Sequence, residues 1–342
     1  METVYYKIKD NRTENTAALE KAGEIIRSGG LVAFPTETVY GLGASALSDT
    51  AAKKIYEAKG RPSDNPLIVH ISDTAEAEKI AYTSEMYQKL AERFMPGPLT
   101  VILPKKDIIP DSVTGGGDTV GIRCPINETA RELIRLAGVP IAAPSANSSG
   151  KPSPTSALHV KADLNGKIDM IIDGGECDIG VESTVISLCG DALTILRPGA
   201  VTEDMLRKVC ADVTIDKAVV DPSLAGANPK SPGMKYKHYS PMANVILLDG
   251  NSEAFIDYVN RTAGKRDGVF AAVNEKDKFD CTVLTVGDGS DEDIIHQLYA
   301  QLRHADDLLL DNVYIKAPAT SGEALALYNR LIRAAGGKVI KL

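Results

Sequence analysis

Apolar residues along this chain alternate between the spacing of a helix and the spacing of a strand. Within residues 15–28 they recur every three or four positions, which predicts a helix, and the run LVAFP at 31–35 predicts a strand. Further helices are expected over 49–58, near 84–94 and over 127–137, and further strands over 67–71, 99–104, 119–123, 140–144, 169–173, 181–188 and 193–197. This alternation favours an α/β fold, and the many short strands in its second half favour a mixed sheet.

A break in this pattern divides the chain. Residues 216–241 are rich in proline and carry little periodicity, which is typical of a linker or a functional lid. Beyond the break, strands are expected at 244–250, 268–273, 281–286 and 313–316, and helices over 252–263, 291–310 and 321–335. This second alternation predicts a small doubly wound α/β domain of about a hundred residues. We therefore expect a first domain at 1–212, a linker or lid at 213–241 and a second domain at 242–342.

The composition is that of a protein with a sizeable core. The 342 residues are 44% hydrophobic and 25% charged, and the formal net charge is -8. Such a charge argues against sequence-independent nucleic-acid binding by the whole surface, although a local basic cleft remains open. The N-terminus lacks the layout of a signal peptide, and the five cysteines include no C-x-x-C pair. These features argue against a zinc site or a disulfide framework and predict a cytoplasmic location.

The connecting pieces between residues 34 and 70 carry polar groups that a buried core does not require. Lys59 and Arg61 follow a predicted helix directly, and two prolines stiffen a loop that also holds Ser63 and Asn65. Cations in this position are often only a solvated helix end that complements the helix dipole. Here the arginine fork, the lysine charge and the nearby small polar groups predict a cradle for a triphosphate.

Two other features of this stretch have competing interpretations. Gly41 and Gly43 fit the start of a G-x-G-x-x-A dinucleotide fingerprint, but residues 35–38 separate them from the preceding strand. We therefore expect them to be turn or packing residues. His70 lies inside the apolar strand LIVHI, where a hydrogen-bonded structural histidine and a ligand-binding histidine are equally open interpretations.

Polar residues also mark the ends of later strands. Arg123 ends the apolar strand 119–123, and a buried arginine is expected to meet a carboxylate, either of the protein or of a ligand. In PIAAPSAN the small residues Ala142 and Ala143 allow a ligand to approach closely. Further candidates for polar or charged contacts to a ligand are Ser145, Asn147, Ser153, Ser183 and Arg197. The sequence shows no convincing nucleophile, so it favours catalysis by positioning and charge neutralisation over covalent catalysis.

Several motifs, taken in order, resemble a known family. FPTETVYGLG, AKGRPSDNPLIVH, PGPLT, TVGIRCP, PIAAPSAN followed by PSPT, VESTVI and LRPG look like the YrdC-like domain of threonylcarbamoyl-AMP synthases. SPGMKYKHYSP at 231–241 and the α/β region after it resemble the longer, two-domain form. The resemblance implies a YrdC-like domain with a mixed, twisted sheet and helices, followed by a smaller Rossmann-like doubly wound α/β domain.

The resemblance also implies a reaction. The expected enzyme is a nucleotidyltransferase that joins L-threonine, bicarbonate or CO2, and ATP to give threonylcarbamoyl-AMP and pyrophosphate. By analogy with the family, the residues that hold threonine or its carbamate are Thr36, His70, Arg123, Ala143 and Ser183. Those that hold ATP are Lys59, Ser63, Thr119, Ser145, Asn147, Ser153, Arg197 and Tyr236, with Lys59 and Arg61 as the catalytic cations. Mg²⁺ is expected to accompany ATP through ligands that the sequence does not identify.

A place in tRNA modification follows from the same resemblance. A partner enzyme, a tRNA threonylcarbamoyltransferase, would move the threonylcarbamoyl group to the adenosine beside the anticodon of certain tRNAs. Neither a membrane nor strong direct nucleic-acid binding is expected. Three alternatives stay open, a carbamoyltransferase that shares the YrdC-like domain, an RNA-binding YrdC-like protein and a non-catalytic ligand sensor, for which the number of cations is large. The first would bring zinc-finger cysteine pairs, and the net charge of -8 counts against the second.

Overall fold

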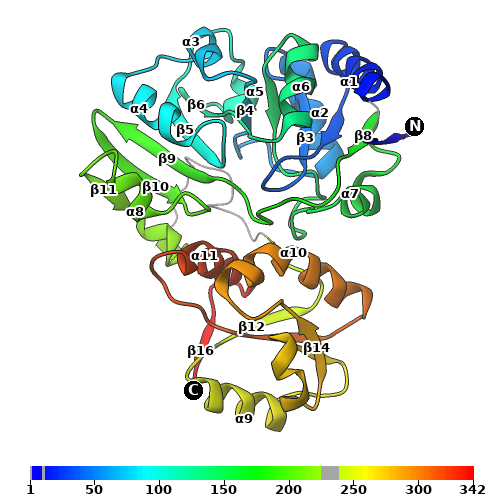
Figure 1. Ribbon diagram of the computed structural model, residues 1–342, viewed down its shortest axis with the longest axis vertical. Coiled ribbons are helices and arrows are strands. Elements are labelled where there is room, and N and C mark those ends of the chain that lie inside the picture. The colour runs from blue at the N-terminus through cyan, green and yellow to red at the C-terminus, as the bar shows by residue number, and fades with distance from the viewer. Residues whose placement is uncertain (1, 10–11, 225–238) are drawn as a thin grey trace.

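The computed structural model describes residues 2–9, 12–224 and 239–342, which form two α/β domains (Figure 1). The strands of the first domain are β1 (Val4–Lys7), β2 (Val32–Phe34), β3 (Gly41–Ser45), β4 (Ile68–His70), β5 (Leu99–Pro104), β6 (Thr119–Arg123), β7 (Ile141–Ala143), β8 (Met170–Asp173), β9 (Thr184–Cys189), β10 (Ala192–Arg197) and β11 (Val213–Ile215). Its α-helices are α1 (Arg12–Arg27), α2 (Asp49–Lys59), α3 (Ala77–Ile80), α4 (Glu85–Phe94), α5 (Asp111–Thr114), α6 (Glu128–Ala137), α7 (Ala157–Leu164) and α8 (Glu203–Arg207).

The first domain is built on one continuous mixed sheet. Its eleven strands lie in the order β1-β8-β2-β3-β7-β4-β6-β5-β9-β10-β11. Neighbours such as β4 and β6 run parallel, whereas β4 and β7 run antiparallel. The mixed sheet expected from the short strands is therefore confirmed.

Alternate residues of the central strands pack on opposite sides of this sheet. Ala33 and Ala142 belong to one core cluster, and their neighbours Val32, Phe34 and Ile141 belong to another. This is the period of two that a strand imposes on its side chains. Helices α1 and α6 cover the second cluster, and helices α2, α4 and α7 contribute to the first. Both faces of the sheet are thus buried, so polar side chains gather at the strand ends.

The two glycines after β2 are packing residues in a strand that the sequence analysis did not identify. Strand β3 runs antiparallel to β2, with Gly41 opposite Phe34 and Gly43 opposite Val32. A Cβ atom built on Gly43 would lie 2.7 Å from Cγ2 of Ile141, which is too close for any larger residue. The packing interpretation is therefore confirmed, and the dinucleotide fingerprint is excluded because these glycines lie inside a strand and not in the turn that opens a helix.

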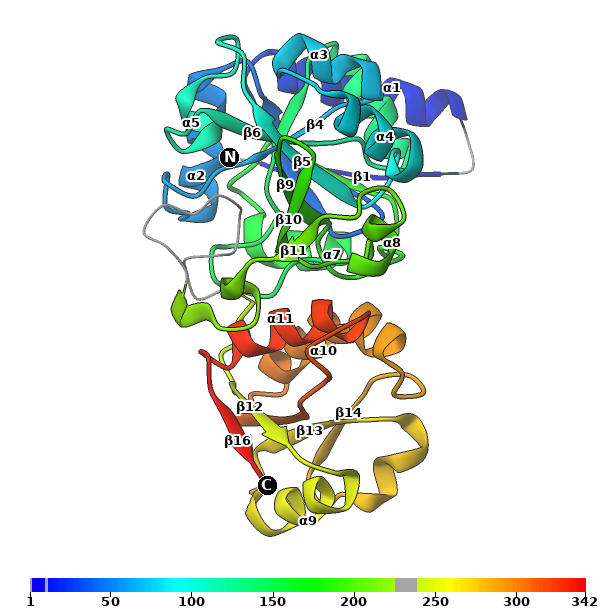
Figure 2. The ribbon, with the colours of Figure 1, turned by 90° about the vertical axis from the view of Figure 1, so that its left-hand side faces the viewer.

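The second domain has a parallel five-stranded sheet with helices on both faces. Its elements are β12 (Asn244–Asp249), α9 (Ser252–Thr262), β13 (Asp267–Ala271), β14 (Thr282–Thr285), α10 (Asp291–Asp307), β15 (Asn312–Lys316), α11 (Ala324–Ala334) and β16 (Val339–Lys341). The strand order is β14-β13-β15-β12-β16. Helices α10 and α11 lie between this sheet and the first domain, whereas α9 covers the far face (Figure 2). The expected doubly wound domain is present.

The first domain extends beyond residue 212, where the sequence placed the start of the linker. Strand β11 pairs in parallel with β10, for example Leu193 with Val213, and so adds residues 213–215 to the sheet. The run VTI is bounded by Asp212 and Asp216, so it is shorter than the five-residue runs LVAFP, LIVHI and PIAAP that identified β2, β4 and β7. Two 3₁₀ turns, η2 (Lys217–Val219) and η3 (Pro222–Leu224), follow it. The predicted linker at 213–241 therefore begins after residue 215, and residues 225–238 within it lie outside the described residues.

The two domains share a hydrophobic cluster. Val39 and Val181 of the first domain pack with Tyr239 and with buried side chains of α10 and α11. Asn329 Nδ2 of α11 also donates to the carbonyl oxygen of Val219, at 2.7 Å. The second domain is therefore part of one packed unit with the first. Within residues 2–9, 12–224 and 239–342, no helix has both the length and the apolar character needed to cross a membrane.

Candidate active site

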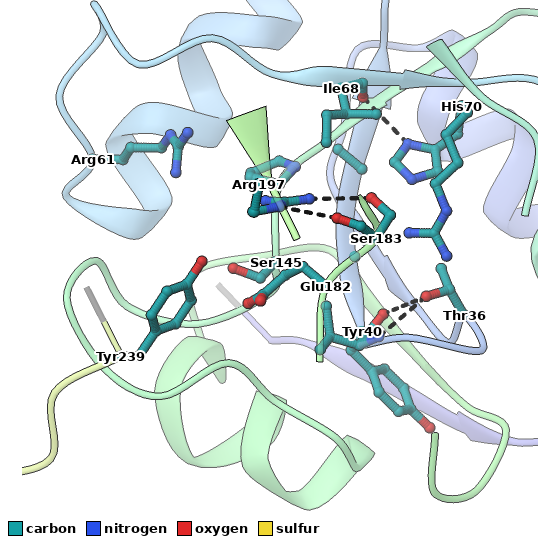
Figure 3. Close-up of a pocket in the computed structure, with 15 residues that line it drawn as sticks. Thr36, Tyr40, Arg61, Ile68, His70, Ser145, Glu182, Ser183, Arg197 and Tyr239 are labelled. Carbon is teal, nitrogen blue, oxygen red and sulfur yellow. Dashed lines mark hydrogen bonds between the residues drawn. The ribbon is translucent and has the colours of Figure 1, made fainter. Parts of the chain in front are cut away.

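A cavity lies where several strands of the first sheet end (Figure 3). His70 ends β4 and Arg123 ends β6, and the two residues are paired in register between these parallel strands. Ser183 directly precedes β9, and Arg197 ends the antiparallel β10. The lining residues are Thr36, Val39, Tyr40, Gly41, Arg61, Ile68, His70, Arg123, Ala143, Pro144, Ser145, Glu182, Ser183, Arg197 and Tyr239.

Most of the predicted site residues meet at this cavity. Those that line it are Thr36, Arg61, His70, Arg123, Ala143, Ser145, Ser183 and Arg197. Lys59, Asn147 and Ser153 do not line it, but each is hydrogen-bonded to a residue that does. Ser63 lies in an exposed turn and Thr119 at the opposite end of β6 from Arg123, so neither borders the cavity. Tyr236 lies outside the described residues.

Lys59 is held by oxygen atoms of the segment after β7. It is the last residue of α2, which ends at Gly60 in the left-handed conformation. Its Nζ donates to the carbonyl oxygen of Ser145 at 2.5 Å and also to the carbonyl oxygen of Asn147. Burial, and then the charge of Arg61, lower the pKa of Lys59 well below its usual value. An arriving polyanion would reverse this, because negative charge favours the protonated amine.

Arg123 meets a carboxylate of the protein, which is one of the two partners that the sequence predicted for it. Its Nη2 lies 2.7 Å from Oε1 of Glu37, and the side chains are only 5% and 3% exposed. This contact is an ion pair without hydrogen-bond geometry. Among the described residues, Nε and Nη2 of Arg123 have no hydrogen-bond partner. The arginine therefore keeps donors for a second carboxylate, such as that of a ligand.

Ser183 and Arg197 are fixed to one another. Arg197 donates from Nε to the carbonyl oxygen of Ser183 at 3.0 Å and from Nη2 to its hydroxyl at 3.1 Å (Figure 3). The hydroxyl also lies 2.8 Å from Oγ1 of Thr100. Gly199 makes this arrangement possible, because a Cβ there would lie 2.6 Å from the amide nitrogen of Thr184. The glycine of LRPG thus lets the β10 end lie close to the Ser183 segment.

His70 is an uncharged residue of this site. Burial, followed by the nearby Arg123, lowers the pKa of His70 to about 3. Its Nδ1 lies 3.2 Å from the carbonyl oxygen of Ile68, which fits a donated hydrogen bond. The two sequence interpretations, structural and ligand-binding, are therefore compatible in one residue, because His70 is hydrogen-bonded and also lines the cavity.

The low pKa of His70 predicts a stability that depends on pH. In the unfolded chain a histidine titrates near 6.5, so between pH 6.5 and 3 only unfolding takes up this proton. Stability is therefore lost as the pH falls below 6.5. Between pH 7 and pH 5, urea unfolding should show that the wild type loses about 2 kcal/mol more than His70→Gln. His304→Gln, at an exposed position of α10, should retain the wild-type pH dependence. Equal losses in the wild type and His70→Gln would contradict the buried neutral imidazole.

Sequence reasoning missed four residues of the site whose side chains carry a hydroxyl or a carboxylate. Tyr40, Glu182 and Tyr239 line the cavity, and Glu37 pairs with Arg123. Signals were present for all four, because Glu37 and Tyr40 lie in the FPTETVYGLG motif, Glu182 in the VEST motif and Tyr239 in the KYKHYSP motif. A charged residue directly beside a predicted ligand residue in a buried segment is the feature that could have identified Glu182.

Comparisons with known proteins match both domains. A family model described as "Telomere recombination" matches residues 24–199, and a model of the threonylcarbamoyl-AMP synthase C-terminal domain matches residues 201–336. The chain is 47% identical to a threonylcarbamoyl-AMP synthase of Pyrococcus abyssi, over 94% of this chain and 95% of that one. It is 43% identical to the enzyme of that name from Bacillus subtilis, over 98% of both. The chain belongs to the threonylcarbamoyl-AMP synthase family.

The fold of this family extends over the whole chain. A structure of P. abyssi Sua5 complexed with L-threonine superimposes with a TM-score of 0.91 at 43% identity and covers 100% of both chains. A putative threonylcarbamoyl-AMP synthase from Methanocaldococcus jannaschii is 38% identical over 56% of this chain and 90% of its own length. Some relatives named as threonylcarbamoyl-AMP synthases are therefore shorter, and the present chain has the two-domain form.

Proposed function

We propose that this protein makes threonylcarbamoyl-AMP and pyrophosphate from L-threonine, ATP and bicarbonate or CO2. The observation that carries the proposal is a cavity with cations for two anionic substrates. Arg61 and Arg197 line it, and Lys59 lies directly behind Ser145. Arg123 and His70 border it beside Thr36. The first group suits a triphosphate and the second suits the carboxylate and hydroxyl of threonine.

The reaction needs two bonds, N–C and O–P, to form and two bonds, N–H and P–O, to break. The amine nitrogen of threonine bonds to the carbon of CO2 and loses a proton, which gives a carbamate. One carbamate oxygen then attacks the α-phosphorus of ATP, and the bond from this phosphorus to the bridging oxygen of the β-phosphate breaks. Pyrophosphate leaves with its electrons, while Lys59, Arg61 and Arg197 neutralise the charge on the phosphates. Arg123 would hold the threonine carboxylate so that the carbamate and the α-phosphorus meet in line.

Burial of these groups fits the chemistry of the intermediates. A carbamate and a carbamoyl-phosphate anhydride both decompose in water, so the site must exclude it. Lys59, Arg61, Arg123 and Arg197 are each less than a tenth exposed, as are Thr36, His70 and Ser183. Charges buried to this degree interact strongly with a bound polyanion.

Mg²⁺ is proposed to enter with ATP rather than in a protein cage. Among residues 2–9, 12–224 and 239–342, no group of three or more His, Cys, Asp and Glu side chains could hold a metal ion. Of the nearby carboxylates, Glu37 is paired with Arg123 and Glu182 with Arg330. Mg²⁺ commonly binds phosphate oxygens and retains waters, and it would supply additional charge neutralisation on the triphosphate.

The product implies a receiving enzyme. A carbamoyl-adenylate is an activated acyl group, so we propose that a tRNA threonylcarbamoyltransferase takes it and transfers it to the adenosine beside the anticodon. All five cysteines are free, which supports the expectation of a reducing, cytoplasmic location. The carbamoyltransferase alternative loses support because no zinc-finger cysteine pairs are present in the sequence.

One assay tests the proposed function. The protein is incubated with ATP, bicarbonate and L-threonine, and pyrophosphate and the adenylate are measured while each substrate is omitted in turn. We expect pyrophosphate release that requires all three substrates. Release that does not depend on threonine would refute the assignment. A salt-dependent affinity for tRNA without any adenylate would instead favour the RNA-binding alternative.

A further inference from the structure

A residue of the second domain is buried against the candidate active site. Arg330, on α11, is fully buried, and its Nε donates to Oε2 of Glu182 at 2.8 Å. Tyr299, on α10, donates from its hydroxyl to the same oxygen at 2.9 Å. Glu182 lines the cavity, and its other oxygen accepts from Ser153 Oγ at 2.5 Å. Two groups of the second domain and one of the first therefore hold a single cavity carboxylate.

Arg330 also connects two segments of the site. Its Nη2 donates to the carbonyl oxygen of Pro198 at 3.0 Å and approaches the carbonyl oxygen of Glu182 at 3.4 Å. Pro198 follows Arg197 directly, and Glu182 precedes Ser183 directly. One guanidinium group thus fixes the neighbours of both partners of the Arg197–Ser183 hydrogen bonds. A planar group with several donors can do this, whereas an ammonium group has no such fork.

The same two residues support Tyr239, another lining residue. The rings of Tyr239 and Tyr299 are stacked, with centroids 5.4 Å apart and an interplanar angle of 26°. The guanidinium carbon of Arg330 lies 5.6 Å from the centroid of the Tyr239 ring. Tyr239 has a φ of 63°, an unusual conformation for a residue other than glycine. A local conformation of this kind persists only where its surroundings fix it.

The electrostatics agree with this geometry. Burial alone would raise the pKa of Glu182, but Arg330 and then Arg197 hold it at about 2. Glu182 is thus a permanent anion between two arginines, one from each domain. If Arg330 were absent, Glu182 would have Arg197 as its remaining nearby cation, and Arg197 would be drawn from its hydrogen bonds to Ser183.

We propose that Arg330 and Tyr299 are positioning residues for adenylate formation, which act through Glu182 to hold Ser153, Ser183 and Arg197 in place. This inference rests on the proposed function. It assigns the second domain a part in the reaction itself. Neither residue touches the cavity directly, so both would act on the orientation of the groups that bind ATP and threonine.

The test compares variants of the full-length protein by ATP affinity and by steady-state kinetics. Arg330→Met is expected to lower kcat/KM for ATP by about 100-fold, the effect of a misplacement of about 1 Å in a site of this kind. Tyr299→Phe, which keeps the ring on Tyr239, is expected to lower it about tenfold and remains informative if Arg330→Met does not fold. His296→Ala is the matched control, because it removes another interdomain hydrogen bond, to the carbonyl oxygen of Asp178, away from Glu182.

A double variant separates positioning from simple stabilisation. If Arg330 acts through Glu182, Glu182→Gln combined with Arg330→Met should be no worse than the poorer single variant. Losses that multiply would overturn the proposal. It would also be overturned if the folded fraction of both Arg330→Met and Tyr299→Phe kept the wild-type kcat/KM. Calorimetric ATP binding keeps the two proposals distinguishable. If the wild-type protein binds ATP but forms no adenylate, the proposed function is refuted and the positioning role is not. In that case Arg330→Met is still expected to bind ATP about tenfold more weakly than the wild type.

Discussion

Replacing Lys59 by methionine is expected to lower adenylate formation by about a thousand-fold while the protein stays folded. The reason is that Lys59 is a buried lysine beside Arg61, and a bound polyanion favours its protonated form. The ammonium group would then neutralise charge on the leaving pyrophosphate, and loss of such a group commonly costs this much. Its hydrogen bonds to Ser145 and Asn147 would be lost, but so would the cost of burying an ammonium group. We expect the free energy of unfolding to change by no more than about 2 kcal/mol.

The control and the pH dependence make this prediction specific. Lys54→Met, on the exposed side of the same helix, removes a hydrogen bond to the carbonyl oxygen of Gly29 and should retain wild-type activity. Because burial, and then Arg61, lower the pKa of Lys59 from 10.5, unfolding takes up a proton between this lowered pKa and pH 10.5. Wild-type stability relative to Lys59→Met should therefore rise with pH towards 10.5. Pyrophosphate release and denaturant unfolding measure the two effects. Activity within tenfold of the wild type would contradict the assigned role.

Replacing Arg123 by methionine is expected to impair both stability and activity. Removal of the arginine leaves Glu37 as a buried carboxylate without its cation, and breaking a buried ion pair in this way costs about 3–5 kcal/mol. The same change removes the proposed clamp for the threonine carboxylate. We expect threonine-dependent pyrophosphate release to fall by at least about 100-fold, with a raised KM for threonine, since a charged hydrogen-bonding partner is lost.

A second substitution separates these two effects. In Glu37→Gln combined with Arg123→Met, no unpaired charge remains, so chemical denaturation should show much of the stability restored while turnover stays low. Arg135→Met is the surface control. Its partner Glu132 is on the same helix, and loss of such an exposed pair should cost less than about 1 kcal/mol. Recovery of threonine-dependent turnover in the double variant would show that Arg123 has only a structural role.

The helices and strands were predictable because burial of one face places apolar residues at regular intervals in the sequence. The strands 99–104 and 119–123 were identified at their observed bounds, since each is an apolar run that ends at a clear polar boundary. Strand β3 was missed because its glycines pack against Phe34 and Ile141. Glycine in a strand carries no apolar signal, and its requirement becomes visible only when the neighbouring strands are placed.

The site residues that lie in local sequence motifs were predictable. Those that depend on contacts between residues far apart in the sequence were not. Arg123 and Ser183 stand out within apolar segments, and both line the cavity. Ser63 shares a motif with His70, and Thr119 shares one with Arg123, but neither borders the cavity. A motif shows that residues are close in sequence and does not show where their side chains point. Arg330 occupies a core position of an apolar helix, three residues after Leu327 and one before Leu331. Its partner, Glu182, is 148 residues away, and no local pattern specifies such a pairing.

This separation of 148 residues has a consequence during synthesis. The ribosome adds about 5–20 residues per second, so Arg330 emerges about 7–30 seconds after Glu182 has been made. During that interval the nascent first domain contains the arginine and serine groups of the site but not their second-domain support. We expect the nascent chain to acquire a competent site only when its last helix has docked. Ribosome-bound chains that end before residue 330 should therefore lack the ATP affinity of the released protein.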